Sequence, residues 1–134
     1  MKLLYTILHY RKGVKLNFSI PINCFGPGLS IQHIGSIVVN NEARIGAFCR
    51  IHEGTTIGAT NGQKTAPQIG DYCFIGTGAK IIGNVHIGSR VGVGANAVVV
   101  KSVPNGVTVG GIPAKIISNN GSYSMIKEWT ETEL

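Results

Sequence analysis

Residues 45–101 read IGAFCRIHEGTTIGATNGQKTAPQIGDYCFIGTGAKIIGNVHIGSRVGVGANAVVVK, and one aliphatic residue recurs there every six positions. The recurring residues are Ile45, Ile51, Ile57, Ile69, Ile75, Ile81, Ile87, Val93 and Val99, and Gln63 interrupts the series. Glycine follows most of them, and a small or β-branched residue stands four places after them, at Cys49, Thr55, Cys73, Ala79, Val85, Val91, Ala97 and Val103. A period of six suits neither an α-helix nor one continuous strand, so it indicates a repeat architecture.

The physical meaning of the repeat is a chain that turns every six residues. Each hexad then forms a short strand whose large aliphatic side chain points inward, and the small residue points inward near a corner with no room for more. Glycine supplies the turn conformation that a Cβ atom would penalise. Stacked coils pair their backbones with the coils above and below, so the sequence predicts an all-β solenoid with a continuous aliphatic core.

The repeat divides the chain into three segments. Residues 1–18 lie outside it, and we expect a short helix or strand that caps the end of the solenoid. Residues 19–117 form the solenoid, with a two-residue shift of register between Ile37 and Val39 and a polar loop extruded near residues 60–68. Residues 118–134 are expected to form a linker and a short tail. Function is expected where a strict repeat becomes irregular.

Length, charge and cysteine content narrow the class of protein. The 134 residues suit one domain, and the net charge of +6 fits an anionic cofactor such as coenzyme A. The basic residues are scattered singly, which is typical of a solvated surface and does not indicate a nucleic-acid partner. No stretch resembles a signal peptide or a membrane span, so we expect a soluble cytoplasmic protein without a membrane partner. Cys24, Cys49 and Cys73 are expected to be buried free thiols.

The four histidines are the candidate general bases for chemistry near neutral pH. His33 lies in the irregular segment before the register shift. His52 directly follows the inward-pointing Ile51, so its side chain should point out of the coil. His86 ends a regular hexad and His9 precedes the solenoid. The irregular setting favours His33.

Five motifs, in this order and spacing, resemble the serine O-acetyltransferase branch of the hexapeptide-repeat acyltransferases. They are Gln32-His33 before Ile37-Val38-Val39, the loop before Pro67, Ile75-Gly76-Thr77-Gly78-Ala79-Lys80-Ile81, Gly92-Val93-Gly94-Ala95 and Gly111-Ile112-Pro113-Ala114-Lys115. The resemblance covers roughly residues 20–117. It implies a left-handed parallel β-helix, assembled as a homotrimer with active sites between subunits. It also implies direct transfer of acetyl from acetyl-CoA to an acceptor hydroxyl, without a metal and without a covalent acyl-enzyme.

The same resemblance assigns roles to individual residues. His33 is the general base, and His52 is a candidate second imidazole. The coenzyme A arm is expected against Gly76, Thr77, Gly94 and Ala95, whose small side chains let the ligand approach the backbone. Lys115 matches a basic position near the nucleotide, and Arg90 is a possible substitute for a family lysine that is Gly92 here.

The departures from the family pattern concern the acceptor. Two family aspartates fall at Phe18 and Gln32, and the family's Arg-His-Pro aligns with Thr65-Ala66-Pro67. Without that arginine a serine carboxylate would be held poorly, unless Arg44 or Arg50 replaces it. A related branch from capsule and polysaccharide gene sets, presumed to acetylate sugars, is similar at residues 25–31, 50–52 and 66–67. The acceptor is therefore open between L-serine and a sugar hydroxyl.

Two other functions remain as alternatives. An inactive or regulatory homologue would keep coenzyme A binding without turnover. A zinc-dependent carbonic anhydrase on the same fold needs three converging histidines, two of them close in sequence, and His33, His52 and His86 lack that spacing. The family's C-terminus can insert into a partner sulfhydrylase, but the usual terminal isoleucine is Leu134 here, so no such role is expected.

Overall fold

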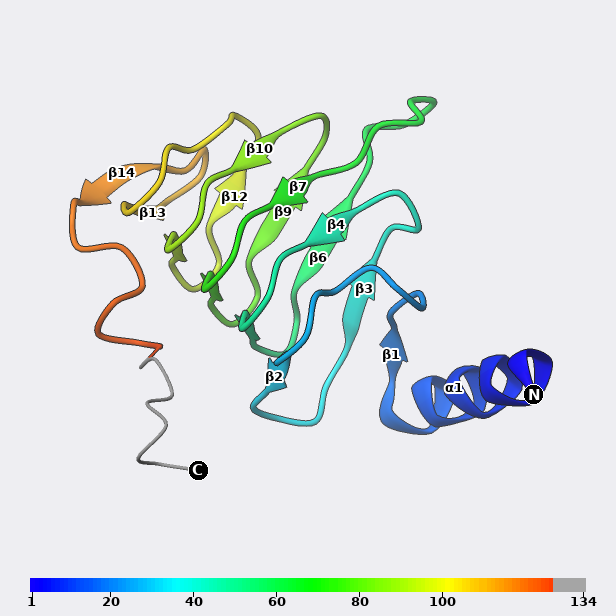
Figure 1. Cartoon of the computed structure of the whole chain (residues 1–134). Helices are drawn as coiled ribbons and strands as arrows, with labels where there is room; N and C mark the ends of the chain where they lie inside the picture. The colour runs from blue at the N-terminus through cyan, green and yellow to red at the C-terminus, as the bar shows by residue number, and fades with distance from the viewer. Residues whose placement is uncertain (127–134) are drawn as a thin grey trace.

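The computed structural model describes residues 1–126, and its strands wind into a stack of coils with three faces (Figure 1). The five-stranded face contains β1 (Phe18–Ser19), β3 (Ile37–Val39), β6 (Thr56–Gly58), β9 (Lys80–Ile82) and β12 (Val98–Val99). The three-stranded face contains β4 (Arg44–Ile45), β7 (Gln68–Ile69) and β10 (His86–Ile87). The six-stranded face contains β2 (Ser30–Ile31), β5 (Arg50–Ile51), β8 (Phe74–Ile75), β11 (Gly92–Val93), β13 (Thr108–Gly110) and β14 (Lys115–Ser118).

The core is the aliphatic column that the six-residue period predicts. Within each face the strands of successive coils pair in parallel, and the hexad residues lie opposite one another, as Ile51 does with Ile75 and Ile57 with Ile81. All nine recurring aliphatic residues are buried, and so are all eight small residues four places after them. Gln63, which interrupts the series, is exposed. The prediction of an all-β solenoid is confirmed.

Three corners join the faces, and we name each by its residues. The histidine corner, from the six-stranded to the five-stranded face, contains residues 32–36, 52–55, 76–79 and 94–97. The loop corner, from there to the three-stranded face, contains residues 40–43, 59–67, 83–85 and 100–102. The aromatic corner, which leads back to the six-stranded face, contains residues 26–29, 46–49, 70–73 and 88–91.

Both irregularities of the sequence lie at corners. Ile31 pairs with Ile51 and Val38 with Thr56, so the first coil passes the histidine corner with two more residues than the second. At the loop corner, residues 59–67 project beyond the coils where the next coil needs only residues 83–85 (Figure 1). Strand pairing is undisturbed on either side, because the extra residues leave the prism instead of entering it.

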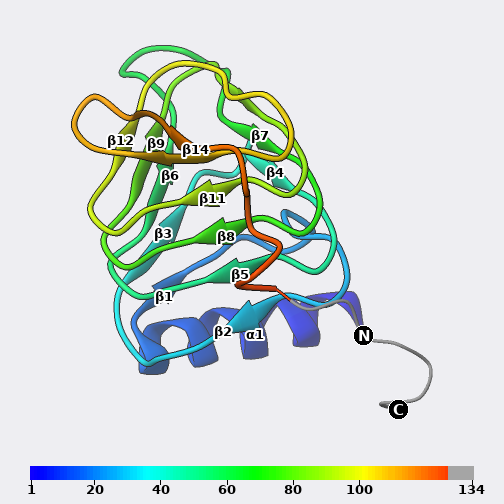
Figure 2. The ribbon, with the colours of Figure 1, turned by 90° about the vertical axis from the view of Figure 1, so that its left-hand side faces the viewer.

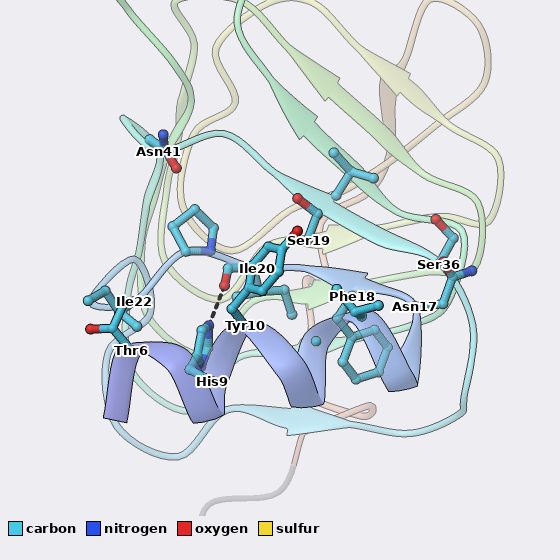
Figure 3. Close-up of a pocket in the computed structure, with 14 residues that line it drawn as sticks. Thr6, His9, Tyr10, Asn17, Phe18, Ser19, Ile20, Ile22, Ser36 and Asn41 are labelled. Atoms are coloured by element: carbon cyan, nitrogen blue, oxygen red, sulfur yellow. Dashed lines mark hydrogen bonds between the residues drawn. The ribbon is translucent and has the colours of Figure 1, made fainter. Parts of the chain in front are cut away.

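The N-terminal segment is a helix, α1 (Lys2–Leu16), which lies across the first end of the stack (Figure 2). It ends at Asn17, whose left-handed backbone (φ 62°) turns the chain into β1. Within the described residues 1–126, no residue of α1 is buried. A cavity of about 610 Å³ separates α1 from the first coil, and His9 Nε2 lies 2.6 Å from the carbonyl oxygen of Ile20 across it (Figure 3).

The chain after the last coil differs from the expected linker and tail. β14 pairs antiparallel with β13, and the following residues run back across β11, β8 and β5 on the six-stranded face (Figure 2). Ser122 is completely buried there, and its hydroxyl donates a hydrogen bond to the carbonyl of Tyr72. These contacts are tertiary, between residues about fifty apart, so the six-residue period does not reveal them. Trp129 and Leu134 lie outside the described residues.

None of the helices within residues 1–126 has the length and hydropathy needed to cross a membrane.

Candidate active site

His33 and His52 meet at the histidine corner, in successive coils. Their ring centroids are 5.8 Å apart with an edge-to-face arrangement. The extra residues of the first coil carry His33 outward, and its side chain is exposed. His52 points out of its coil after the buried Ile51, and its ring centroid lies 5.1 Å from that of Phe74. The structure thus brings together the two imidazoles that the sequence analysis selected, nineteen positions apart in the chain.

Glu53 joins this pair and was not selected from the sequence. It follows His52, and its Oε1 accepts a hydrogen bond from the Thr77 hydroxyl at 3.2 Å. The hydrogen bond from its own backbone N–H lowers the pKa of the Glu53 carboxyl most. Burial opposes this effect, while Thr77, His33 and then His52 lower the pKa further. The carboxyl is therefore ionised at neutral pH. Glu53 is not one of the positions that the six-residue period selects. A single acidic residue at a corner would ordinarily be interpreted as a solvated surface residue.

The predicted cofactor residues continue the same corner into the next coils. Gly76 and Thr77 follow β8, and Gly94 and Ala95 follow β11. The corner is tied coil to coil by backbone hydrogen bonds: Gly78 N–H donates to the Glu53 carbonyl at 2.9 Å, and Asn96 N–H to the Thr77 carbonyl at 2.8 Å. A Cβ atom on Gly76 would approach the Ala95 backbone nitrogen to 2.9 Å, so glycine is required for coils to stack this closely.

Lys115 lies at the far end of the stack. It is the first residue of β14, it pairs with Gly110, and its side chain is exposed. His33, His52, Gly76, Thr77, Gly94 and Ala95 thus follow one edge of the prism, with Lys115 beyond the last coil on the adjoining face.

Arg90 is not brought to this edge. It lies at the aromatic corner, where its guanidinium carbon is 4.5 Å from the centroid of the Tyr72 ring and 4.8 Å from that of Tyr123. The structure therefore separates Arg90 from the other predicted cofactor residues within one chain. Arg90 was selected because it is only two residues from Gly92 in the sequence. In the structure Arg90 lies at the aromatic corner, whereas Gly92 lies in β11 on the six-stranded face.

The positions that depart from the family pattern offer no carboxylate. Phe18 is half-buried in β1 and packs against the core, and the Gln32 side-chain amide donates to the Ser30 hydroxyl at 2.6 Å. Ala66 is buried beneath the projecting loop. Of the two candidate arginines, Arg44 donates to the carbonyls of its own turn. Arg50 Nη1 donates to the Met125 carbonyl at 3.0 Å, so another segment of the same chain occupies it in part.

The cysteines lie within the coils, as predicted. Cys24, Cys49 and Cys73 are buried free thiols. Hydrogen bonding with Cys49, followed by burial, raises the pKa of Cys73 well above the ordinary range for a thiol. Burial also raises the pKa of Cys24. His86 is exposed on β10 of another face. Within residues 1–126, no group of three histidine, cysteine or acidic side chains is placed to hold a metal ion.

Comparison with known proteins finds relatives in sequence and in structure. Residues 66–101 match the family described as bacterial transferase hexapeptide (six repeats). A serine acetyltransferase of Staphylococcus xylosus is 36% identical over 122 residues, which are 90% of this chain and 55% of that protein. The crystal structure of Neisseria gonorrhoeae serine acetyltransferase superimposes with a TM-score of 0.77 at 31% identity, over 94% of this chain and 52% of that one. A serine acetyltransferase in complex with CoA gives a TM-score of 0.74 at 33% identity, over 87% of this chain and 48% of that one.

The chain is a hexapeptide-repeat protein of the serine acetyltransferase-like type. Its fold is accordingly the left-handed parallel β-helix that the resemblance implied. The chain spans about half the length of the curated relatives it matches.

Proposed function

We propose that this chain is an acetyl-CoA-dependent O-acetyltransferase whose general base is His33. The observation that carries the proposal is the meeting of His33 and His52 at the head of the edge formed by Gly76, Thr77, Gly94 and Ala95. A general base at the head of an edge of small residues is an arrangement that suits acetyl transfer from an extended thioester. The names of the relatives and the CoA complex of one of them support the same activity.

The chemistry assigned to His33 is proton transfer. Its neutral imidazole takes the proton of the acceptor hydroxyl while the oxygen attacks the thioester carbonyl. The tetrahedral intermediate collapses with breakage of the carbon–sulfur bond, and the imidazolium returns its proton to the departing thiolate. His52, 5.8 Å away, is a second imidazole that can bind the acceptor or the developing oxyanion. The buried thiols take no part.

The co-substrate is proposed to lie along the histidine corner. Backbone groups at Thr77 and Ala95 have the fixed spacing between coils that suits the amides of a pantetheine arm. Lys115, exposed beyond the last coil, supplies a cation for the phosphates of the nucleotide. Within one chain Arg90 lies at the aromatic corner, so the proposed cofactor site does not include it.

The proposed acceptor is the hydroxyl of a sugar or the hydroxyl of L-serine. The relatives are named for serine. The absence of the Arg-His pair from residues 65–67, together with the engagement of Arg50 by Met125, argues for a sugar. A buried carboxylate without a cationic partner would bind poorly.

The test is thiol release from acetyl-CoA, measured with L-serine and in parallel with a panel of free and nucleotide-linked sugars. Wild type should turn over one class of acceptor, and His33→Ala should lose at least about 100-fold in kcat. His86→Ala, which changes an exposed histidine on another face, is the matched control and should keep full activity. Coenzyme A binding without turnover on any acceptor would instead favour the inactive or regulatory homologue.

A further inference from the structure

The outer side of helix α1 is apolar over its first half. Two contacts with the first coil identify the inner side: His9 Nε2 lies 2.6 Å from the Ile20 carbonyl oxygen (Figure 3), and a Cβ atom on Gly13 would lie 2.7 Å from the Phe18 carbonyl oxygen. The helical period then places positions 4, 8, 11 and 15 in one row on the outer side. In the first half of the helix this side carries aliphatic residues that are between 43% and 73% exposed, namely Leu3, Leu4, Ile7 and Leu8.

The same side is positively charged over its second half. Arg11, Lys12 and Lys15 continue the outer side toward the end of the helix, and all three are exposed. Residues 1–41 contain no aspartate or glutamate, so this segment has no carboxylate of its own to neutralise these cations. An aliphatic patch and a basic cluster therefore lie end to end on one exposed surface, at the first end of the stack (Figure 2).

The combination of charge and apolar surface limits the class of partner. Contiguous exposed apolar side chains mark an interaction site. A second copy of α1 would bring like charges together, which opposes self-association through this helix. A nucleic acid would bind the cations and leave the aliphatic side chains without a partner. The groove of an acidic protein would select a helix whose apolar side continues along its whole length, whereas here that side changes from apolar to basic after residue 8.

An anionic lipid surface accommodates both halves of the helix at once. The aliphatic side chains enter the boundary between head groups and acyl chains, while the cations meet lipid phosphates in the same plane. Tyr5 and Tyr10, which are 63% and 71% exposed, favour the same boundary because each has an apolar ring and a polar hydroxyl. With 15 residues, α1 is too short to cross a bilayer and long enough to lie on one.

We propose that α1 is an interfacial anchor, which binds this protein to membranes that contain anionic phospholipid. The inference goes beyond acetyl transfer and does not depend on it. It requires neither a membrane span nor a signal peptide, so it differs from the sequence-based expectation only in adding a membrane partner. Binding through α1 would place the first coil, which carries His33, nearer the lipid than Lys115 beyond the last coil.

The first test is co-sedimentation of the full chain with phospholipid vesicles. We expect binding to phosphatidylcholine vesicles that contain about 30% phosphatidylglycerol, much weaker binding to phosphatidylcholine alone, and weaker binding as salt is raised. The double variant Lys12→Glu/Lys15→Glu should bind the anionic vesicles at least about 10-fold more weakly. Lys64→Glu/Lys101→Glu makes the same change in net charge at exposed positions of the loop corner, and should stay within about twofold of wild type.

The aliphatic half of the helix has its own pair of variants. Leu4→Ser should weaken binding to the anionic vesicles about 10-fold, whereas Ile116→Ser, at an exposed position in β14, should leave it unchanged. All these substitutions alter exposed side chains, so the melting temperature should stay at the wild-type value. Absence of binding to anionic vesicles would overturn the proposal in favour of an acidic protein partner. An equal loss of binding in Lys64→Glu/Lys101→Glu would overturn it by showing that net charge alone is responsible.

The second test asks whether α1 itself enters the lipid. Because the native cysteines are buried, a cysteine introduced by Leu4→Cys can be labelled selectively with a fluorophore whose emission moves to shorter wavelength in an apolar environment. The emission should shift when anionic vesicles are added. The same label on Asn61→Cys, in the exposed loop, should not respond. Vesicle binding without a shift at position 4 would place the membrane contact on another surface and overturn the proposal.

Discussion

At the scale of single residues, the inward or outward direction of a side chain decides its contribution to stability. Val99 is 1% exposed in the core column and its neighbour Val100 is 48% exposed. Val99→Ala should lower the free energy of unfolding by about 2 kcal/mol, because it leaves a cavity in a closely packed column. Val100→Ala should change it by less than about 0.5 kcal/mol. Urea unfolding of both variants checks this, and equal losses would contradict the assigned register.

Burial likewise controls the reactivity of the cysteines. All three thiols are nearly inaccessible to solvent. The pKa values of Cys73 and Cys24 are raised, which keeps these two thiols neutral, whereas hydrogen bonding with Cys73 lowers the pKa of Cys49, so Cys49 is protected by burial alone. Modification of the native protein by a thiol reagent should therefore be at least about 100-fold slower than after unfolding. Asn61→Cys, in the exposed loop, is the control and should add one fast-reacting thiol. Rapid reaction of a wild-type cysteine would show that the coils open easily.

At the scale of the elements, each corner of the prism has its own side-chain chemistry. The aromatic corner stacks Phe48 on Tyr72 with ring centroids 5.2 Å apart, and Arg90 lies over Tyr72 and Tyr123. Phe48, Tyr72 and Arg90 all have left-handed backbones, with φ of 54°, 53° and 56°. The contacts among these three side chains thus offset the conformational strain of the three successive turns.

Arg90→Ala should accordingly act on stability and not on cofactor binding. Losing the cation over the two rings should lower the free energy of unfolding by about 1 kcal/mol and the melting temperature by about 4 °C. KM for acetyl-CoA should stay within about twofold. Lys115→Ala is the matched comparison. Lys115 is exposed at the start of β14, so this substitution should leave the melting temperature unchanged and raise the KM for acetyl-CoA. A raised KM for acetyl-CoA with an unchanged melting temperature in Arg90→Ala would instead indicate that Arg90 binds the cofactor.

The elements also show how far the sequence could be read. The six-residue period predicts the strands, the core and the direction of His52, because each follows from local spacing. The shift near Ile37 predicts an irregular corner beside His33, and the structure places both extra residues there. The position of Glu53 could not be found in this way, since it depends on contacts with Gly35 and Thr77 in neighbouring coils. The segment after β14 is also held by contacts with distant residues, such as that of Ser122 with Tyr72.

At the scale of the whole molecule, one prism contains only part of the expected site. The projecting loop, residues 59–67, lies at the loop corner, whereas His33 and His52 lie at the histidine corner across the five-stranded face. A loop of nine residues cannot complete a site at another corner of its own chain without leaving the face between them. A neighbouring prism whose loop corner approached this histidine corner would cover the exposed Thr77 and Ala95.

We therefore expect a homotrimer in solution, with each site between two chains. Sedimentation analysis should give the mass of three chains, and specific activity should fall on dilution in step with dissociation, because a separated chain loses one wall of its site. His33→Ala should remain trimeric while inactive, which separates assembly from chemistry. Deleting residues 61–64 should lower the activity of the trimer without unfolding the prism, since those residues are exposed and longer loops add little closure entropy. A monomer of undiminished specific activity would place the complete site within one prism and require another role for the loop.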